Sequence, residues 1–352
     1  MEKLKAIINS ISSVDRSLEK EIQFHIDNLT KPPGSLGKLE EIALTYCLIF
    51  NTLQPQWGKK RLFVFAADHG VAVEGVSAFP QEVTSQMVRN MAAGGAAINV
   101  LARHVGAEAK IIDIGVKDSL EGVSGIIPKK IKPGTNNIAI GPAMAEEEAY
   151  QAIEIGIELA QEAYKEGVTL IGTGEMGIAN TTSASALFTA LLPASAEEVT
   201  GYGTGIDEIT RLKKIEVIKR ALKVNQNHLN HPFSTLAALG GLEIAAICGV
   251  ILGAASLRIP VVVDGFISSA GVLVAGKLCP QVKDYLFFSH CSDEMGHRIF
   301  FERFGAAPLL DLKLRLGEGT GAALAMSLIE AAIKLYNEMA TFSGAGVSRK
   351  RK

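Results

Sequence analysis

The spacing of hydrophobic residues predicts helices at the start of the chain. Over residues 2–28 they recur every three to four positions, which is the pattern of an amphipathic helix. They are Leu4, Ile7, Ile8, Ile11, Leu18, Ile22 and Ile26. The segment 31–37 (KPPGSLG) ends this helix, because proline lacks a backbone donor and glycine tolerates positive φ. A second helix is expected to follow as far as about Phe50.

The pattern then changes to short apolar runs that are typical of buried strands. Each run is rich in β-branched or aromatic residues and ends at Gly, Asp, Ser or His. The runs are 61–67, 110–115, 137–141, 168–172, 259–265 and 285–290. Long helical patterns separate most of them, at 143–165, 208–224 and 319–338.

Strands that alternate with helices predict an α/β fold with a mostly parallel, Rossmann-like sheet and helices on both faces, plus a small helical subdomain. We expect a helical N-terminal subdomain (1–58), a catalytic α/β domain (59–318), and a C-terminal helix and tail (319–352) packed on the helical subdomain. Ligands bind such sheets beyond the carboxyl ends of the strands. The polar residues that end these runs are therefore candidates for the site.

One stretch, 235–257, is long enough to cross a membrane and contains a single charge, Glu243. It is rich in Ala and Gly and leads into another strand-like run, so we predict a buried core helix instead. The net charge of −2 offers no attraction to nucleic acid or to an anionic membrane. The basic run 349–352 is expected to be a solvated tail.

The spacing of cysteine and histidine residues indicates whether the protein has a metal site and which cellular compartment it occupies. The four cysteines are scattered without a CxxC pair, which favours reduced, buried thiols. The seven histidines show no HxH or HxxxH spacing, so no metal site is expected. Residues 1–5 continue into charged helical sequence without a secretory signal, which predicts a cytoplasmic protein.

The segment 168–182 combines a strand, a glycine-rich turn and a helix start. Gly172, Gly174 and Gly177 match GxGxxG, the dinucleotide-binding pattern. However, Glu175 would repel a pyrophosphate, and no second strand with an acidic end follows about 20 residues later. A turn that offers backbone N–H groups and Thr hydroxyls to a smaller ligand is favoured. A turn that only permits tight packing stays possible.

Other segments offer charges or proton-transfer groups. The glycines of 201–207, with Thr204 and nearby lysines, could cradle a phosphate. Asp68 and His69 end a strand and could transfer protons, or form a structural hydrogen-bonded pair; His290 has the same two interpretations. Glu318 lies between glycines before a long helix. Spacing alone leaves it equally a general base or a charge favoured by the helix dipole.

Six ordered segments together resemble one family, the nicotinate-nucleotide–dimethylbenzimidazole phosphoribosyltransferases of cobalamin lower-ligand synthesis. They are 29–40 (LTKPPGSLGKLE), 67–70 (ADHG), 77–84 (SAFPQEVT), 172–182 (GTGEMGIANTT), 262–266 (VVDGF) and 315–322 (RLGEGTGA). The resemblance covers nearly the whole chain. It implies transfer of ribose 5-phosphate from nicotinate mononucleotide to 5,6-dimethylbenzimidazole with inversion, without metal or cofactor, in a homodimer that binds neither nucleic acid nor membrane.

The resemblance also implies roles for individual residues. Glu318 would be the general base and Glu175 a second carboxylate near the nucleotide. The phosphate would meet Gly203, Thr204 and Lys214, with the helix start at Asn180 and Thr181 as a weaker addition. Gly177 would also bind substrate, and Asp264 and Ser292 would meet the ribose or nicotinate. Phe79, Gln81, Gln86, Met87 and Leu316 would line the benzimidazole slot. Some relatives have Ser and Gln in place of Phe79 and Met87, so other benzimidazoles or adenine are further possible acceptors.

Two rival enzyme classes share parts of this pattern. A pyrophosphate-type phosphoribosyltransferase would use 261–266 as its ribose-phosphate loop, but the acidic pair and the Thr-Gly that bind its magnesium complex are missing. An NAD-dependent oxidoreductase would need 168–182 to be a dinucleotide-binding turn. A nucleotide-binding module without enzymatic activity is a third alternative.

Overall fold

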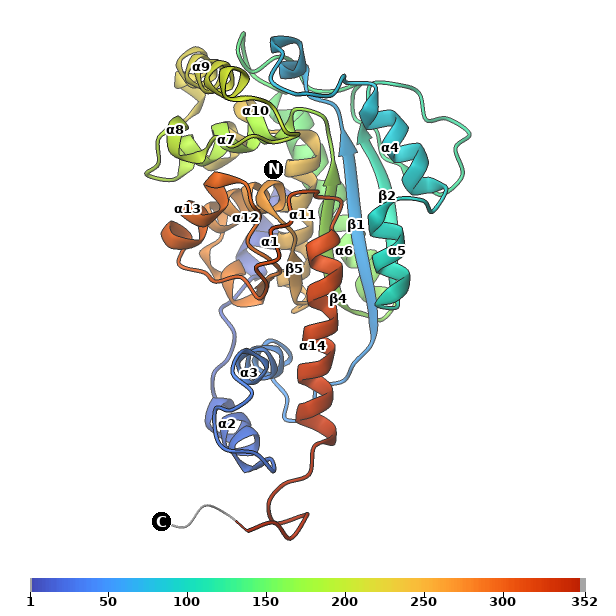
Figure 1. Cartoon of the computed structure of the whole chain (residues 1–352), viewed down its shortest axis with the longest axis vertical. Coiled ribbons are helices and arrows are strands. Elements are labelled where there is room, and N and C mark those ends of the chain that lie inside the picture. Colours follow the sequence, from blue (N-terminus) through green and yellow to red (C-terminus); the bar gives the residue numbers. More distant parts are fainter. Residues whose placement is uncertain (1, 349–352) are drawn as a thin grey trace.

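Figure 1 shows the computed structural model, which describes residues 2–348. The basic run 349–352 lies outside the described residues. The body of the molecule is built around a sheet, and a narrower stem of helices extends from it. The long helix near the C-terminus runs from the body into the stem.

Six strands form one sheet in the order β3-β2-β1-β4-β5-β6, and every neighbouring pair is parallel. The strands are β1 (Lys59–Ala67), β2 (Ala107–Gly115), β3 (Ile126–Pro128), β4 (Val168–Met176), β5 (Val261–Val263) and β6 (Leu286–Phe288). The prediction of a parallel α/β sheet is confirmed. The strand order reverses direction between β1 and β4. In such sheets a crevice forms beyond the carboxyl ends of the strands at this point, and ligands bind there.

The helices connect the strands and cover the sheet. They are α1 (Glu2–Ser10), α2 (Glu19–Asn28), α3 (Lys38–Phe50), α4 (Val83–Ala92), α5 (Ala97–His104), α6 (Glu146–Lys165), α7 (Asn180–Leu191), α8 (Ala196–Val199), α9 (Glu208–Val224), α10 (Pro232–Leu239), α11 (Leu242–Ser256), α12 (Phe266–Leu278), α13 (Met295–Phe304) and α14 (Thr320–Glu338). Short 3₁₀ turns are η1 (Gly70–Glu74), η2 (Gln226–His228) and η3 (Pro280–Tyr285).

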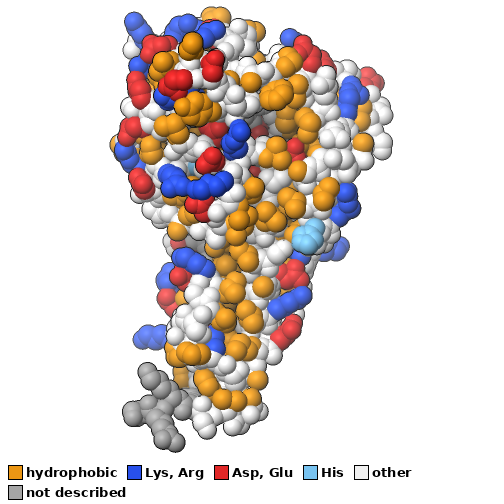
Figure 2. Space-filling model, in the orientation of Figure 1, with side chains coloured by type: hydrophobic (Ala, Val, Ile, Leu, Met, Phe, Trp, Pro, Cys, Tyr) orange, Lys and Arg blue, Asp and Glu red, His pale blue; other side chains and the backbone are white. Residues whose placement is uncertain are grey.

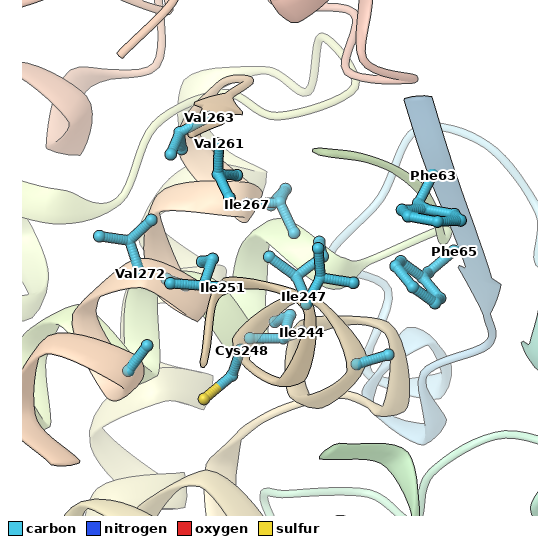
Figure 3. Close-up of a cluster of buried hydrophobic side chains, with 14 of the residues drawn as sticks. Phe63, Phe65, Ile244, Ile247, Cys248, Ile251, Val261, Val263, Ile267 and Val272 are labelled. Atoms are coloured by element: carbon cyan, nitrogen blue, oxygen red, sulfur yellow. The ribbon is translucent and has the colours of Figure 1, made fainter. Parts of the chain in front are cut away.

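Alternate side chains of β1 point to opposite faces of the sheet, as the period of a strand requires. Phe63 and Phe65 lie with Ile244 and Ile247 of α11 in the apolar cluster of Figure 3. Leu62, the residue before Phe63, lies on the other face, where the side chains of α14 meet β4. Helices therefore cover both faces of the sheet, and the burial of these apolar side chains stabilises the fold.

Glycines set how closely elements approach in two places. A Cβ at Gly156 of α6 would overlap the backbone of α11, and one at Gly249 of α11 would overlap the carbonyl of Ile153. A Cβ at Gly172 of β4 would overlap Leu62 and contact Met326 of α14. The small residues therefore let two helices cross in contact and let α14 lie directly on β4.

Four sequence expectations need correction. Residues 137–141 form a turn, since the Asn137 side chain accepts a hydrogen bond from the Ala139 N–H and Asn137 accepts another from Ile140 through its carbonyl. This local bonding of an Asn competes with strand pairing.

The strand β3 was missed, because it has only three residues at the sheet edge. Strand β4 continues to Met176, so Gly172 and Gly174 belong to the strand and not to a turn.

The fourth correction concerns the predicted helix 2–28, which is two helices. Residues 11–18 leave the helical conformation and dock on η3: the Tyr285 hydroxyl donates to the Ser12 carbonyl at 2.8 Å, and the Val14 N–H donates to Asp284 at 3.1 Å. α1 consequently packs near α11, while α2 packs on α3. The division of the chain into three domains stays a prediction.

The apolar stretch 235–257 is also interrupted. It spans the end of α10 and all of α11, which Gly240 and Gly241 separate, and both helices are buried. A Cβ at Gly241 would overlap the ring of His69, so this break lets α11 begin against the end of β1. Within residues 2–348 no helix is long and apolar enough to cross a membrane.

Candidate active site

A cavity of about 390 Å³ opens at the carboxyl ends of the strands. Its walls come from the segments that follow β1, β4, β5 and β6, and from the turn that precedes α14. It receives most of the residues predicted from the sequence: Phe79, Met87, Glu175, Gly177, Asn180, Thr181, Gly203, Thr204, Asp264, Ser292, Leu316 and Glu318.

Three predicted residues lie outside this lining. The Gln81 side chain turns inward and donates to the carbonyl of His69 at 3.0 Å, and Gln86 is exposed on α4. Lys214 is completely buried on α9, behind the lining, where its Nζ donates to Thr181 Oγ1 at 2.7 Å. Lys214 therefore contacts the lining of the cavity through Thr181.

The backbone around Glu318 is strained. Gly317, Glu318 and Gly319 all have positive φ, at 83°, 64° and 94°. Such a conformation is uncommon for a residue with a side chain and persists only where the surroundings enforce it. Here the Glu318 N–H donates to the Glu175 carbonyl at 3.2 Å, and a Cβ at Gly174 would overlap the Glu318 carbonyl. The turn thus lies directly on β4.

The Glu318 carboxylate is held by a neighbouring helix and not by its own. Its Oε2 accepts a hydrogen bond from the Ile98 N–H, in the first turn of α5, at 3.2 Å. Burial raises the pKa of Glu318, and the charge of Asp264 adds to this effect. Within the described residues Oε1 has no hydrogen-bond partner, so one oxygen is available to a ligand.

Asp264 ties the same turn down from the other side. Its Oδ2 accepts from the Gly319 N–H at 3.1 Å, and its Oδ1 accepts from the Ala322 N–H at 3.0 Å. These N–H groups belong to the start of α14, where a carboxylate is favoured by the helix dipole. Both oxygens of Asp264 therefore accept hydrogen bonds from the start of α14, and the residue also lines the cavity.

Glu175 closes the far end of β4 with a buried carboxyl group. Its Oε2 accepts a hydrogen bond from the Asn180 side chain at the start of α7. Burial raises the pKa of Glu175 to about 8, and the charges of Glu243, Asp264 and Glu318 push it in the same direction, against the effect of Asn180. In these surroundings the group is predominantly protonated at neutral pH.

Positive charge gathers at the Gly203 end of the cavity. A Cβ at Gly203 would lie 2.8 Å from Thr181 Oγ1 and 3.3 Å from Lys214 Nζ, so the glycine leaves these groups room to face the loop. The Arg315 guanidinium donates to the Gly203 carbonyl at 3.3 Å. Desolvation lowers the pKa of Lys214 to about 8, and the charge of Glu294 opposes this.

Two charged residues of this region were not predicted from the sequence. Arg315 and Glu294 both line the cavity. Burial raises the pKa of Glu294, while the nearby charge of Lys214 lowers it. Arg315 stands three residues before Glu318, which is a signal that could have identified it, since a cation beside a glycine loop suits an anion. Glu294 had no comparable signal, because its neighbours Gly201 and Lys214 are distant in the sequence.

Asp68 and His69 lie behind the cavity, where each forms hydrogen bonds with other parts of the protein. His69 is fully buried, with Nε2 2.6 Å from Glu243 and Nδ1 3.0 Å from the Ser183 hydroxyl. Asp68 accepts a hydrogen bond from the Lys117 N–H at 2.7 Å. Neither residue lines the cavity. Their side chains bond to these separate partners and not to each other, so the pair that the sequence suggested does not form.

Comparisons with known proteins agree along the full chain. A family profile described as phosphoribosyltransferase matches residues 11–347. The nicotinate-nucleotide–dimethylbenzimidazole phosphoribosyltransferases of Pelodictyon phaeoclathratiforme and Prosthecochloris aestuarii are 60% and 59% identical to the chain, each over 99% of both proteins. The crystal structure of CobT from Thermus thermophilus has a TM-score of 0.91 at 46% identity, covering 95% of this chain and 99% of that one.

The raised pKa of Glu175 predicts a dependence of stability on pH. Its pKa is about 8 when folded and near 4.5 when unfolded, so the folded state holds a proton that the unfolded chain has released. Stability from this group is fully present below the unfolded pKa and is lost as pH rises through the folded one. Glu175→Gln cannot ionise, so it does not lose this stability. The free energy of unfolding of the variant, minus that of the wild type, should therefore increase by on the order of a few kcal/mol as pH rises through this range.

Urea unfolding at a series of pH values measures this difference. Glu121→Gln, which changes an exposed carboxylate outside the cavity, is the control and should follow the wild type. Parallel pH curves for Glu175→Gln and the wild type would show that Glu175 ionises normally in the folded protein.

Proposed function

The chain belongs to the family of nicotinate-nucleotide–dimethylbenzimidazole phosphoribosyltransferases, and from this premise we propose how its cavity performs the reaction. The enzyme transfers ribose 5-phosphate from nicotinate mononucleotide to 5,6-dimethylbenzimidazole, giving α-ribazole 5′-phosphate and nicotinate in cobalamin synthesis. The observation that supports our assignment of roles is the Glu318 carboxylate, which a strained turn presents to the cavity with one oxygen unbound.

The reaction needs one proton to be removed. A ring nitrogen of the acceptor attacks the anomeric carbon from the face opposite nicotinate, which inverts the configuration from β to α. The bond to nicotinate breaks toward the pyridinium nitrogen, which takes the electron pair and becomes neutral. The acceptor ring becomes cationic as it bonds and must lose its other N–H proton, and Glu318 accepts that proton.

The surroundings of Glu318 suit a base. The Ile98 N–H fixes Oε2, so Oε1 points to one place and loses little freedom when it meets the acceptor. Burial and the nearby Asp264 raise the pKa of Glu318, which makes the carboxylate a stronger proton acceptor. Leu316, two residues earlier, lines the same cavity and contributes an apolar surface for the ring.

Glu175 is proposed to respond to positive charge. Its proton is held because the group is buried away from water and close to other carboxylates. A cationic pyridinium, and then the positive charge that develops on the sugar, favours the ionised form of Glu175. The group would therefore release its proton as the donor binds and stabilise the transition state electrostatically.

The phosphate of the donor is assigned to the opposite end of the cavity. Gly203 and Thr204 offer a loop, Thr181 offers a hydroxyl at the start of α7, and Arg315 and Lys214 supply charge. Thr204 Oγ1 accepts from the Ala78 N–H at 2.9 Å, which ties this loop to the segment after β1. Backbone N–H groups at a helix start add to the attraction for an anion.

The acceptor ring is assigned to the apolar wall formed by Phe79, Val83, Met87 and Leu316. Phe79 and Leu316 are exposed at the mouth of the cavity, whereas Val83 and Met87 are half-buried. A flat dimethylated ring buries apolar area against this wall. Unsubstituted or hydroxylated benzimidazoles and adenine are proposed as alternative acceptors.

An assay of the reaction tests this function directly. The protein, incubated with nicotinate mononucleotide and dimethylbenzimidazole, should form α-ribazole 5′-phosphate, detected by mass spectrometry. Excess EDTA should leave the rate unchanged, because the leaving group is already cationic and departs without a Lewis acid. Absence of product would contradict the reaction, and loss of activity in EDTA would contradict the metal-free mechanism.

Glu318→Gln tests the base. The amide keeps the shape of the side chain but cannot take the proton, so kcat should fall by roughly 10²–10⁴-fold. KM for the nucleotide should change little, because Glu318 is assigned to the acceptor. Glu318→Asp, which keeps a carboxylate but withdraws it, should give an intermediate rate. A near-normal kcat for Glu318→Gln would move the role to Glu175 or to water.

We also propose a cytoplasmic homodimer. The four cysteines are free and buried, which suits a reducing compartment. Figure 2 shows hydrophobic side chains along the stem, over α14. Phe24 of α2 and Leu53, after α3, are large apolar side chains that are exposed on this part of the chain. Surfaces of this kind mark interfaces, and two-fold dimers are the commonest assemblies.

Sedimentation equilibrium at micromolar concentration tests the assembly. A homodimer has twice the mass of the 37.4 kDa chain. The replacement Phe24→Glu should weaken association without changing the fold, because its side chain is exposed. A wild-type protein that sediments as a monomer would contradict the proposed dimer.

A further inference from the structure

His290 follows β6 and lines the cavity, yet the mechanism above gives it no task. Its ring is 2% exposed and stands between the end of β5 and the start of α14. A Cβ at Gly321 of α14 would overlap this ring, so the glycine leaves space for the imidazole. The ring is therefore held in one orientation.

The hydrogen bonds of Ser289 determine which ring nitrogen holds the proton. The Ser289 hydroxyl donates to the Asp264 carbonyl at 3.1 Å, and a carbonyl can only accept. The same oxygen lies 3.1 Å from His290 Nδ1. Because the hydroxyl proton is already used, Nδ1 must donate its N–H to Ser289. In the neutral ring, Nε2 then has a free lone pair.

This lone pair is accessible from the cavity. Within the described residues Nε2 has no hydrogen-bond partner. A Cβ at Gly265 would lie 3.4 Å from Nε2 and 3.2 Å from the adjacent ring carbon, so the glycine leaves more room on this side of the ring. Asp264, 3.9 Å from Nδ1, is occupied by the N–H groups of α14 and does not cover Nε2.

An acceptor atom in a binding site needs a donor from the ligand. Nicotinate mononucleotide at neutral pH has a carboxylate, a phosphate and a pyridinium ring without N–H, so its only hydrogen-bond donors are the two ribose hydroxyls. The N–H of the acceptor ring is assigned to Glu318. We propose that His290 Nε2 accepts a hydrogen bond from a ribose hydroxyl of the donor and makes the enzyme selective for ribonucleotides over deoxyribonucleotides.

This role of His290 rests on the proposed function and deepens it. A site that holds a buried acceptor for a substrate hydroxyl discriminates against an analogue without it, because the acceptor is then left unpaired. Ser292 and Asp264, which the sequence suggested for the ribose, differ from His290 Nε2 because their oxygens already accept hydrogen bonds within the protein. Both oxygens of Asp264 already accept hydrogen bonds from α14, and the Ser292 hydroxyl accepts from the Glu294 N–H at 3.3 Å.

The first test needs no variant. Nicotinate mononucleotide and its 2′-deoxy and 3′-deoxy analogues are compared as donors at one concentration of dimethylbenzimidazole. The wild type should show kcat/KM at least roughly tenfold lower for one of the two analogues, the size of one hydrogen bond lost. Equal use of all three donors would overturn the proposal. No product from nicotinate mononucleotide itself would instead refute the proposed function.

Two substitutions then assign the hydroxyl to His290. His290→Asn keeps a polar group next to Ser289 but removes the atom at Nε2, whereas His290→Gln restores an oxygen or nitrogen near that position. His290→Asn should use the ribose donor and the disfavoured deoxy analogue equally well, and His290→Gln should recover part of the discrimination. A purely structural role would lower both rates and leave their ratio unchanged.

Nicotinamide mononucleotide, used as a further donor, distinguishes this role of His290 from a contact between His290 and the nicotinate carboxylate. If His290 were a donor to the nicotinate carboxylate, His290→Asn would change the ratio between nicotinate and nicotinamide donors and leave the ratio between ribose and deoxyribose donors as in the wild type. That result, like an unchanged ribose-to-deoxyribose ratio in His290→Asn, overturns the proposal.

Discussion

The close approach of α14 to the sheet is the constraint on which the site depends. The turn before this helix lies on β4, where Gly174 leaves room for the Glu318 carbonyl and Gly172 leaves room for α14. Asp264 then pins the first N–H groups of the helix. With these contacts in place, Glu318 adopts a positive φ that a residue with a side chain rarely adopts. The contacts of the turn, and not the strain, hold the carboxylate at the cavity wall, so the fold itself orients the proposed base.

Electrostatics divide the cavity into regions with different chemistry. Glu175, Asp264 and Glu318 are buried carboxyls whose pKa is raised by burial. Lys214 and Arg315 lie toward Gly203, together with the buried Glu294, whose pKa burial raises and their charges lower. An anionic phosphate is therefore favoured at one end, and positive charge is favoured beside the carboxyls. A donor with a phosphate at one end and a pyridinium at the other fits this gradient in a single orientation.

The sequence predicted the architecture well, because each buried parallel strand is a continuous apolar run that ends at a polar residue. It misread elements whose conformation is set by contacts distant in the sequence. Gly172 and Gly174 look like a dinucleotide turn, yet they are strand residues whose missing side chains admit α14. The break between α1 and α2 depends on η3, which lies more than 250 residues away in the chain. Similarly, spacing could not choose between the two roles of His69, because its partners Ser183 and Glu243 are brought to it only by folding.

The helical stem contributes to the active site through α14, although none of its described residues lines the cavity. At the far end of α14 the Tyr336 hydroxyl donates to the Leu53 carbonyl at 3.2 Å, and the Asn337 side chain donates to the Pro55 carbonyl at 2.9 Å. In its middle Met326 lies over Gly172, and its first turn is bound by Asp264. A continuous helix transmits displacement along its axis, because its packed side chains compress little. Glu318 therefore lies just before a helix that is held at three places along its length, by Asp264 at its start, by Gly172 of β4, and by the segment after α3 at its far end.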